Sequence, residues 1–220
     1  MKERRFFVTF AILLALVGML AGCASSGSVA NLSTEELLVR GSSYYQKNDY
    51  NRAIRDFTEV IRRDPDIATA YFMRGNAYLY GKSDYDRAIA DYGMVINLEP
   101  PAVGALWRRG EAYLVGKKDY DRAIADFSEA ITIEPNPTLY FQRGNAYMEK
   151  KDADNAISDY SEAINLDPNH ADAYFQRGVV YGNTGDFNKA IADWETVLKL
   201  NPNHPNAGQY IEIARRQLGN

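Results

Sequence analysis

The sequence predicts an all-α protein, a solenoid of five helix pairs followed by a C-terminal capping helix. The pentapeptide Arg-Gly-Asn-Ala-Tyr occurs twice, at 74–78 and 143–147. Its glycine recurs five times, at spacings of 34, 35, 34 and 34 residues, and a tyrosine follows three positions later each time. Such a period is typical of solenoids, in which each unit buries its apolar face against the next. The five glycines are Gly41, Gly75, Gly110, Gly144 and Gly178, and the tyrosines are Tyr44, Tyr78, Tyr113, Tyr147 and Tyr181.

The first helix pair shows how each unit is built. Ser33 and Glu36 have the spacing of a capping box, which predicts a helix over 34–46. A polar turn at 47–49 separates it from a second helix over 50–63. Pro65 cannot continue that helix, so the unit ends there.

The later units repeat this pattern. Each second helix begins after an aspartate, whose carboxylate suits a helix N-terminus, and carries an alanine with an aromatic residue four positions later on the same face. The later aspartates are Asp84, Asp119, Asp152 and Asp186. The alanine and aromatic pairs are Ala53 and Phe57, Ala88 and Tyr92, Ala123 and Phe127, Ala156 and Tyr160, and Ala190 and Trp194. Small residues such as Gly75 should let the helices approach closely around these aromatic rings.

Two irregularities and an added helix complete the array. The second and third units carry one extra residue in the turn between their helices, at 81–83 and 116–118, which should change the turn and leave the architecture intact. After Pro202, apolar residues recur with helical spacing over 205–218. This segment is expected to cover the last open face of the solenoid.

The glycine, tyrosine, alanine, aromatic and proline positions together resemble the tetratricopeptide repeat (TPR), which pairs two antiparallel helices in each 34-residue unit. The resemblance covers residues 34–204 and implies a right-handed superhelix. It divides the chain into units 34–67, 68–102, 103–136, 137–170 and 171–204, with a capping helix over 205–220.

The N-terminus resembles the signal of a bacterial lipoprotein. A basic start and an apolar run of 15 residues, 6–20, predict a signal peptide over 1–22. The following Cys23 ends a stretch similar to a lipobox, and the family implies diacylation there, for example with palmitate, after cleavage. Residues 23–33 then form the lipidated cysteine and a flexible tether. The alternative is an ordinary signal peptide with a cysteine near its cleavage site.

The resemblance also suggests a location. Ala24 follows the cysteine, which in enterobacterial lipoproteins favours the outer membrane, facing the periplasm. Acyl chains on Cys23 would hold the protein at the membrane, and two or more chains make the attachment stable.

Charge and residue content exclude several classes of function. A net charge of −4 argues against a nucleic-acid partner, which requires a basic face. With one cysteine, no intramolecular disulfide is possible. No catalytic constellation is present, so we expect a non-enzymatic protein with no metal and no cofactor besides the lipid. His170 and His204 are interpreted as solvated turn residues.

Arginines precede all five glycines, and aspartates recur as regularly in the second helices. Two readings are open: an arginine ladder that binds phosphate or carboxylate, or internal pairing between the two ladders. The arginines are Arg40, Arg74, Arg109, Arg143 and Arg177, and the aspartates are Asp56, Asp91, Asp126, Asp159 and Asp193.

The first helices carry a second apolar stripe beside their packing face, and the family places this stripe in a concave groove. Large aromatic residues here would supply contact area to a peptide, while amides such as Asn76 appear left over to pair with its backbone. The alternative is that the aromatics only pack neighbouring helices together. We define the groove row by this prediction: Phe72, Asn76, Leu79, Trp107, Glu111, Phe141, Asn145, Met148 and Phe175, with Leu114 and Val179 at matching positions.

The sequence therefore favours a membrane-anchored scaffold that binds a protein or peptide in the groove during envelope assembly, similar to pilotins or adaptors of peptidoglycan hydrolases. Phe72, Trp107, Phe141 and Phe175 stand where the family's clamp for a C-terminal carboxylate has a lysine, so that specificity is not expected. A transporter-associated lipoprotein that binds a small apolar ligand, and a self-associating structural protein, are the alternatives.

Overall fold

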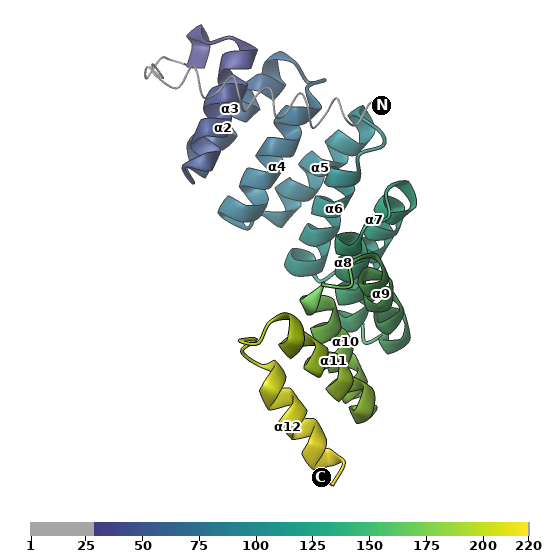
Figure 1. Cartoon of the computed structure of the whole chain (residues 1–220). Helices are drawn as coiled ribbons and strands as arrows, with labels where there is room; N and C mark the ends of the chain where they lie inside the picture. The colour runs from purple at the N-terminus through teal and green to yellow at the C-terminus, as the bar shows by residue number, and fades with distance from the viewer. Residues whose placement is uncertain (1–28, 220) are drawn as a thin grey trace. The chain divides into compact units, whose positions relative to one another are not determined.

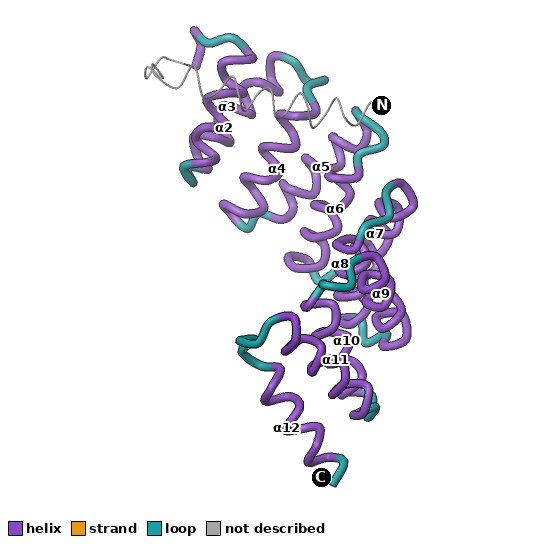
Figure 2. Tube along the Cα trace, in the orientation of Figure 1, coloured by secondary structure: helices purple, strands orange, loops and turns teal. Residues whose placement is uncertain are grey.

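Every regular element that the structure describes is helical, as the 34-residue period predicts (Figure 2). The structure is a computed structural model, and it describes residues 29–219. The predicted signal peptide and Cys23 lie outside these residues. Within them there are eleven α-helices and no strand, which confirms the all-α prediction of five helix pairs and a capping helix (Figure 1).

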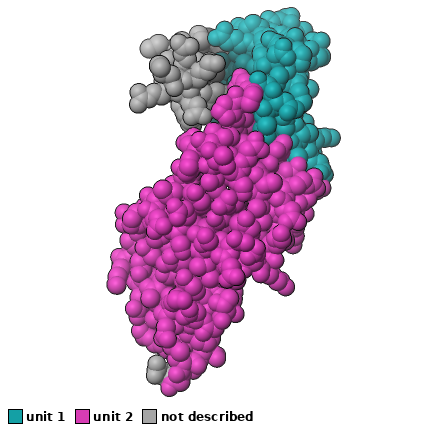
Figure 3. All heavy atoms as spheres, turned by 90° about the vertical axis from the view of Figure 1, so that its right-hand side faces the viewer, with its two compact units in different colours: residues 1–98 teal, residues 99–220 magenta. Residues whose placement is uncertain are grey.

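The chain divides into two units after Leu98, and each is described by itself (Figure 3). In the first unit α2 packs against α3, α4 packs against α5, and α3 also contacts α4. Its elements are the 3₁₀ turn η1 Val29–Asn31 and the helices α2 Thr34–Gln46, α3 Tyr50–Arg63, α4 Ala68–Lys82 and α5 Tyr85–Leu98.

The second unit holds three helix pairs and the last helix, stacked in chain order. Its helices are α6 Val103–Glu111, continued by the π-helical segment η2 Ala112–Lys117, then α7 Tyr120–Ile133, α8 Pro137–Glu149, α9 Ala153–Leu166, α10 Ala171–Asn183, α11 Phe187–Leu200 and α12 Ala207–Gln217. Ile211 and Ala214 of α12 are buried together with Trp194 and Val197 of α11, so α12 caps this unit as expected.

Each helix pair closes around one aromatic ring. A Cβ atom added at Gly75 would lie 2.9 Å from the Tyr92 ring, and one at Gly144 would lie 2.8 Å from the Tyr160 ring. Real Cβ atoms do not approach that closely, so a glycine is required for the ring to fit. Tyr92 and Tyr160 are fully buried as a result.

The arginine and aspartate ladders pair internally, which confirms the second of the two readings. Arg143 donates from Nε and Nη2 to the two carboxylate oxygens of Asp159, at 2.8 and 2.7 Å. Its Nη1 also donates to Ser128 of the preceding second helix, at 2.9 Å. The other four pairs have the same two-bond geometry, and their aspartates are also buried: Arg40–Asp56, Arg74–Asp91, Arg109–Asp126 and Arg177–Asp193.

One backbone hydrogen bond defines the turn inside every repeat. The amide of the aspartate that precedes the second helix donates to the carbonyl of the repeat tyrosine, at 2.8 Å from Asp49 to Tyr44 and at 3.0 Å from Asp119 to Tyr113. The extra residue of the second and third repeats is absorbed within this loop. In all five repeats the residue before this aspartate is left-handed, with φ of 51° at Ser83 and Lys118, so the insertion does not cause that geometry. In the third repeat the end of the first helix widens into the π-helical segment η2.

The predicted helix N-caps are confirmed with one exception. Ser33 and Glu36 form the capping box, and the aspartates before α3, α5, α7 and α9 accept a bond from the amide three residues on. Asp186 instead pairs with the Lys189 ammonium at 2.6 Å.

The expected tether is shorter than its predicted range. Val29–Asn31 form η1, and Val29 and Leu32 pack against the buried cluster of Leu37, Val60 and Ala70. Arg63 of α3 donates to the carbonyls of Val29, at 2.9 Å, and of Leu32. The apolar side chains of Val29 and Leu32 pack on the first repeat and hold this stretch in place, whereas a polar tether has no apolar side chains to bury.

Candidate binding groove

The groove row falls on the first helices of the second to fifth repeats, and its members differ in what they contact. In the first unit, Phe72 lies edge-on to the Tyr92 ring with centroids 5.8 Å apart, and Leu79 is buried. Phe72 stays partly exposed. This helix therefore offers one aromatic side chain of the row.

The prediction that Asn76 is left over for a ligand is wrong for its carbonyl. Asn76 Oδ1 accepts a hydrogen bond from the Tyr92 hydroxyl at 2.8 Å, and Asn145 Oδ1 accepts one from Tyr160 at 2.8 Å. Burial raises the pKa of the Tyr160 hydroxyl above its ordinary range, and Asp159 adds to the effect, so this hydroxyl stays a donor. No described residue accepts a bond from the amide nitrogen of either asparagine.

In the second unit the row begins on α6. Trp107 is partly buried and its indole nitrogen meets no hydrogen-bond acceptor among residues 29–219. The Arg108 guanidinium lies 4.2 Å from the centre of the indole and bonds Glu111 at 2.8 Å. Glu111 is thus already paired with a cation.

The row continues on α8 and α10 with side chains that pack on one side and are partly exposed. Phe141 contacts the Tyr160 ring at 5.8 Å, and Met148 lies with its sulfur 3.7 Å from the Tyr160 hydroxyl. Phe175 and Val179 border the buried cluster around Trp194. All four are partly exposed, so they serve packing and still present apolar surface.

The two histidines lie in the loops between helices, as predicted, but they are partly buried and hydrogen-bonded instead of fully solvated. His170 Nδ1 accepts a bond from the Ala173 amide at 3.3 Å, which caps α10, and its ring lies 4.9 Å from Phe141. His204 repeats the arrangement, with Nδ1 3.2 Å from the Ala207 amide and its ring 4.6 Å from Phe175. Each histidine therefore joins a helix start to a groove aromatic of the preceding repeat.

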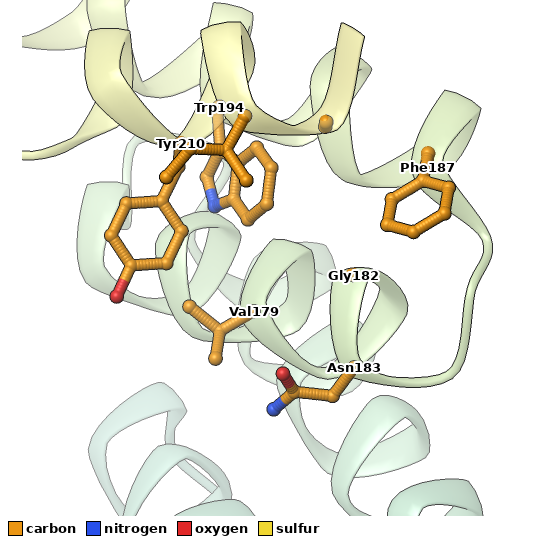
Figure 4. A pocket seen from close by; sticks show the side chains of 8 residues that line it. Val179, Gly182, Asn183, Phe187, Trp194 and Tyr210 are labelled. Atoms are coloured by element: carbon orange, nitrogen blue, oxygen red, sulfur yellow. The ribbon is translucent and has the colours of Figure 1, made fainter. Parts of the chain in front are cut away.

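A pocket of about 260 Å³ continues the row at the end of the second unit. Figure 4 shows Val179, Gly182 and Asn183 on one helix, with Tyr210 beside the Trp194 ring. The lining residues are Val179, Gly182 and Asn183 of α10, Phe187 and Trp194 of α11, and Tyr210, Ile213 and Ala214 of α12. Val179 is the one lining residue that belongs to the groove row, because the pocket depends on how three helices pack and leaves no motif in the sequence.

Other kinds of site find no support in the described part of the chain. Among residues 29–219 there is no cluster of three or more histidine, cysteine, aspartate or glutamate side chains that would suit a metal ion. Within the same residues, none of the helices has the length and apolar character needed to cross a bilayer.

Family comparisons match most of the described residues. The tetratricopeptide repeat model matches residues 38–94, 78–138 and 171–204, and a TPR repeat model matches residues 144–185. A search of curated protein sequences finds no match.

Solved structures share the fold. The crystal structure of MamA protein is 22% identical, covers 80% of this chain and 94% of its own, and superposes with a TM-score of 0.72. The structure described as YrrB, a TPR protein with an unusual peptide-binding site, is 21% identical, with coverages of 80% and 91% and a TM-score of 0.69. The first TPR of Spaghetti (RPAP3), bound to the HSP90 peptide SRMEEVD, is 28% identical over 56% of this chain and 97% of its own, with a TM-score of 0.52.

Proposed function

Since this chain belongs to the tetratricopeptide repeat family, we propose that it is a non-enzymatic scaffold that binds a protein or peptide in its groove and is anchored to a bacterial membrane through Cys23. The family fold and a peptide-bound relative support a protein-interaction role. The envelope setting, at the outer membrane facing the periplasm, rests on the signal-like N-terminus.

The main support for a binding groove is that its large side chains are partly exposed. The ring between the helices of each pair is buried, whereas Phe141, Met148, Phe175 and Val179 remain partly exposed. Apolar side chains that are already held by packing lose little further entropy when a partner covers them. A partner that lies along α8 and α10 would bury all four.

The groove of the second unit is suited to an uncharged segment. Its apolar side chains alternate with the Asn145 and Asn183 amides, and Arg108 is already paired with Glu111. An amide can pair with the backbone of a bound peptide at little desolvation cost compared with a charge. The SRMEEVD peptide of the Spaghetti relative is acidic, and the groove row of the second unit carries Trp107, Phe141 and Phe175 at positions where a cation would favour such a tail.

The groove is tested by adding charge to it. Val179→Lys should reduce the recovery of partners by at least about tenfold in crosslinking and pull-down from intact cells. The reason is that burying a lysine in an apolar contact costs more than about 1.4 kcal/mol of binding free energy. Leu166→Lys is the matched control, since Leu166 is 47% exposed at the end of the second helix α9. Equal recovery with both variants, at equal thermal stability, would exclude the groove.

The anchor is tested separately. Cys23→Ser should move the protein from the membrane fraction to the soluble fraction, because the thiol that accepts the acyl chains is gone. Radiolabelled palmitate should label the wild type and leave the variant unlabelled. A variant that stays with the membrane after a carbonate wash would refute lipidation at this residue.

A further inference from the structure

The pocket at the end of the second unit is bordered by a glycine at a position where the other repeats carry a side chain. Four positions after its glycine, each of the first four repeats carries a large side chain: Tyr45, Leu79, Leu114 and Met148. The fifth repeat has Gly182 there. In the fourth repeat Met148 lies against the Tyr160 hydroxyl, whereas an atom added at Gly182 would already be 3.2 Å from the far edge of the Trp194 ring. The Trp194 ring, itself only 3% exposed, therefore reaches almost to the backbone of Gly182.

The walls of the pocket are held in place and are almost entirely apolar. The Tyr210 ring lies edge-on to Trp194 at 5.2 Å and to Phe175 at 5.4 Å. Ile213, 48% exposed, stands at the opening on α12. The polar side-chain groups among the lining residues are the Asn183 amide, the Tyr210 hydroxyl and the Trp194 indole N–H, and the indole N–H donates to the Phe175 carbonyl at 3.2 Å. No lining residue carries a charge, so a charged occupant would lose its hydration without compensation.

We propose that this pocket receives one uncharged aromatic or large aliphatic side chain of the polypeptide that lies in the groove. The inference deepens the proposed function and rests on it. A volume of about 260 Å³ exceeds the roughly 150 Å³ of an apolar cavity that holds benzene. The pocket therefore has room for a phenyl or indole group.

The position of the pocket points to a side chain on a polypeptide as its occupant. Val179 belongs both to the groove row and to the pocket wall, so a segment that covers Phe175 and Val179 continues directly to the opening. At that opening the Asn183 amide is able to donate to, and accept from, a peptide bond. Walls without a charged side chain match an uncharged residue of the bound segment.

The test uses the full chain in phospholipid nanodiscs and four peptides, acetyl-Asn-Ser-X-Ser-Asn-amide with X as Phe, Leu, Ala or Glu. Binding is followed by the emission of Trp194 in a Trp107→Phe background, since the chain has two tryptophans. We expect the Phe peptide to bind about 10- to 100-fold more tightly than the Ala peptide, from burial of one ring, and the Glu peptide no more tightly than Ala.

Two glycine variants make the test specific. Gly182→Met restores the side chain that the fourth repeat carries and should reduce the ratio between the Phe and Ala peptides to within about threefold. Gly208→Met is the matched control, because Gly208 lies on α12 with open space around its Cβ position and outside the pocket lining. It should keep the wild-type ratio. Ile213→Ser, on the opposite wall, should also lower the ratio and guards against misfolding of Gly182→Met.

The outcomes separate the pocket from the groove. If all the peptides bind but Gly182→Met and Ile213→Ser keep the wild-type ratio, the pocket proposal is overturned and the groove stands. If none of the peptides binds, both proposals fail. If acetyl-phenylalanine amide alone binds as tightly as the pentapeptide, the pocket is a small-molecule site. A dimer in sedimentation velocity that Gly182→Met dissociates would assign the pocket to a second copy of the chain, which also overturns the proposal.

Discussion

The hydroxyl group of a buried tyrosine needs an acceptor, and two repeats supply it from the same position. The aromatic residue between the helices is tyrosine in the second and fourth repeats, and these are the repeats with asparagine after the glycine. Tyr92 bonds Asn76, and Tyr160 bonds Asn145. Where the ring is Phe57 or Phe127, no acceptor is needed, and the residue after the glycine is not asparagine. The asparagine that sets the two copies of the pentapeptide apart from the other repeats is thus explained by one hydrogen bond.

This pairing predicts a strong coupling between the two residues. Asn145→Ala should lower the free energy of unfolding by about 1–3 kcal/mol, because the buried Tyr160 hydroxyl loses its main acceptor. Adding Tyr160→Phe should restore most of that loss, since the unsatisfied donor is then absent. Urea denaturation of the two single variants and the double variant gives the coupling energy. Additive effects would show that the bond contributes nothing.

The residues of the groove were predictable only in part. The helical period placed Phe141 and Phe175 on one face, and the structure leaves both partly exposed. The period does not reveal whether a polar side chain already has a partner, so it does not predict the bond from the Tyr92 hydroxyl to Asn76. The role of His170 is hidden for the same reason, because it depends on contact with the Phe141 ring near the start of the same repeat. Gly182 borders the pocket without contributing a side chain, and the helical period does not reveal such a role.

At the scale of the helix, aspartates and prolines mark the boundaries that the structure shows. Thr34–Gln46 and Tyr50–Arg63 begin and end where the sequence predicts, because the capping box and the Asp-Pro signal act locally. The π-helical segment η2, at the end of the first helix of the third repeat, was predictable only as an altered turn. The second repeat carries an extra residue in the same place and keeps α-helical geometry to Lys82, so the insertion alone does not decide the outcome.

The turn inside each repeat predicts opposite effects for two reciprocal substitutions. Lys151 and Gly185 occupy the same position with φ of 66° and 85°, a region that is unfavourable for a residue with a Cβ atom. Lys151→Gly should therefore raise the free energy of unfolding by about 0.5–1 kcal/mol, and Gly185→Lys should lower it by about 1 kcal/mol. Thermal melts of both variants against wild type measure this. Shifts of the same sign would contradict the explanation.

At the scale of the molecule, the N-terminal turn is fastened to the first repeat by an ion network. Arg63 donates to the Val29 and Leu32 carbonyls and bonds Glu59 at 2.7 Å. Hydrogen bonds from Arg62, and then from Arg63, lower the pKa of Glu59 to about 2 from an ordinary value of 4.5. Because the folded-state pKa is depressed, the stabilisation from this carboxylate is present above pH 4.5 and is lost as the pH falls toward 2.

Acidification should therefore loosen η1. The NMR shifts of residues 29–33 should move toward unfolded values between about pH 4.5 and 2, in step with the protonation of Glu59. Glu59→Gln removes the titrating group, so in this variant the same shifts should no longer follow pH across that window. A wild-type profile that matches the variant would assign the change to other carboxyl groups.

The fastening of η1 also sets how far the protein is able to move from its membrane. Only five residues, 24–28, separate Cys23 from Val29. A fully extended chain gains at most about 3.5 Å per residue, so a lipidated Cys23 would hold Val29 within about 20 Å of the lipid headgroups. If Cys23 is lipidated as proposed, the first repeat would stay near the bilayer surface. A partner would then have to reach the membrane to be bound.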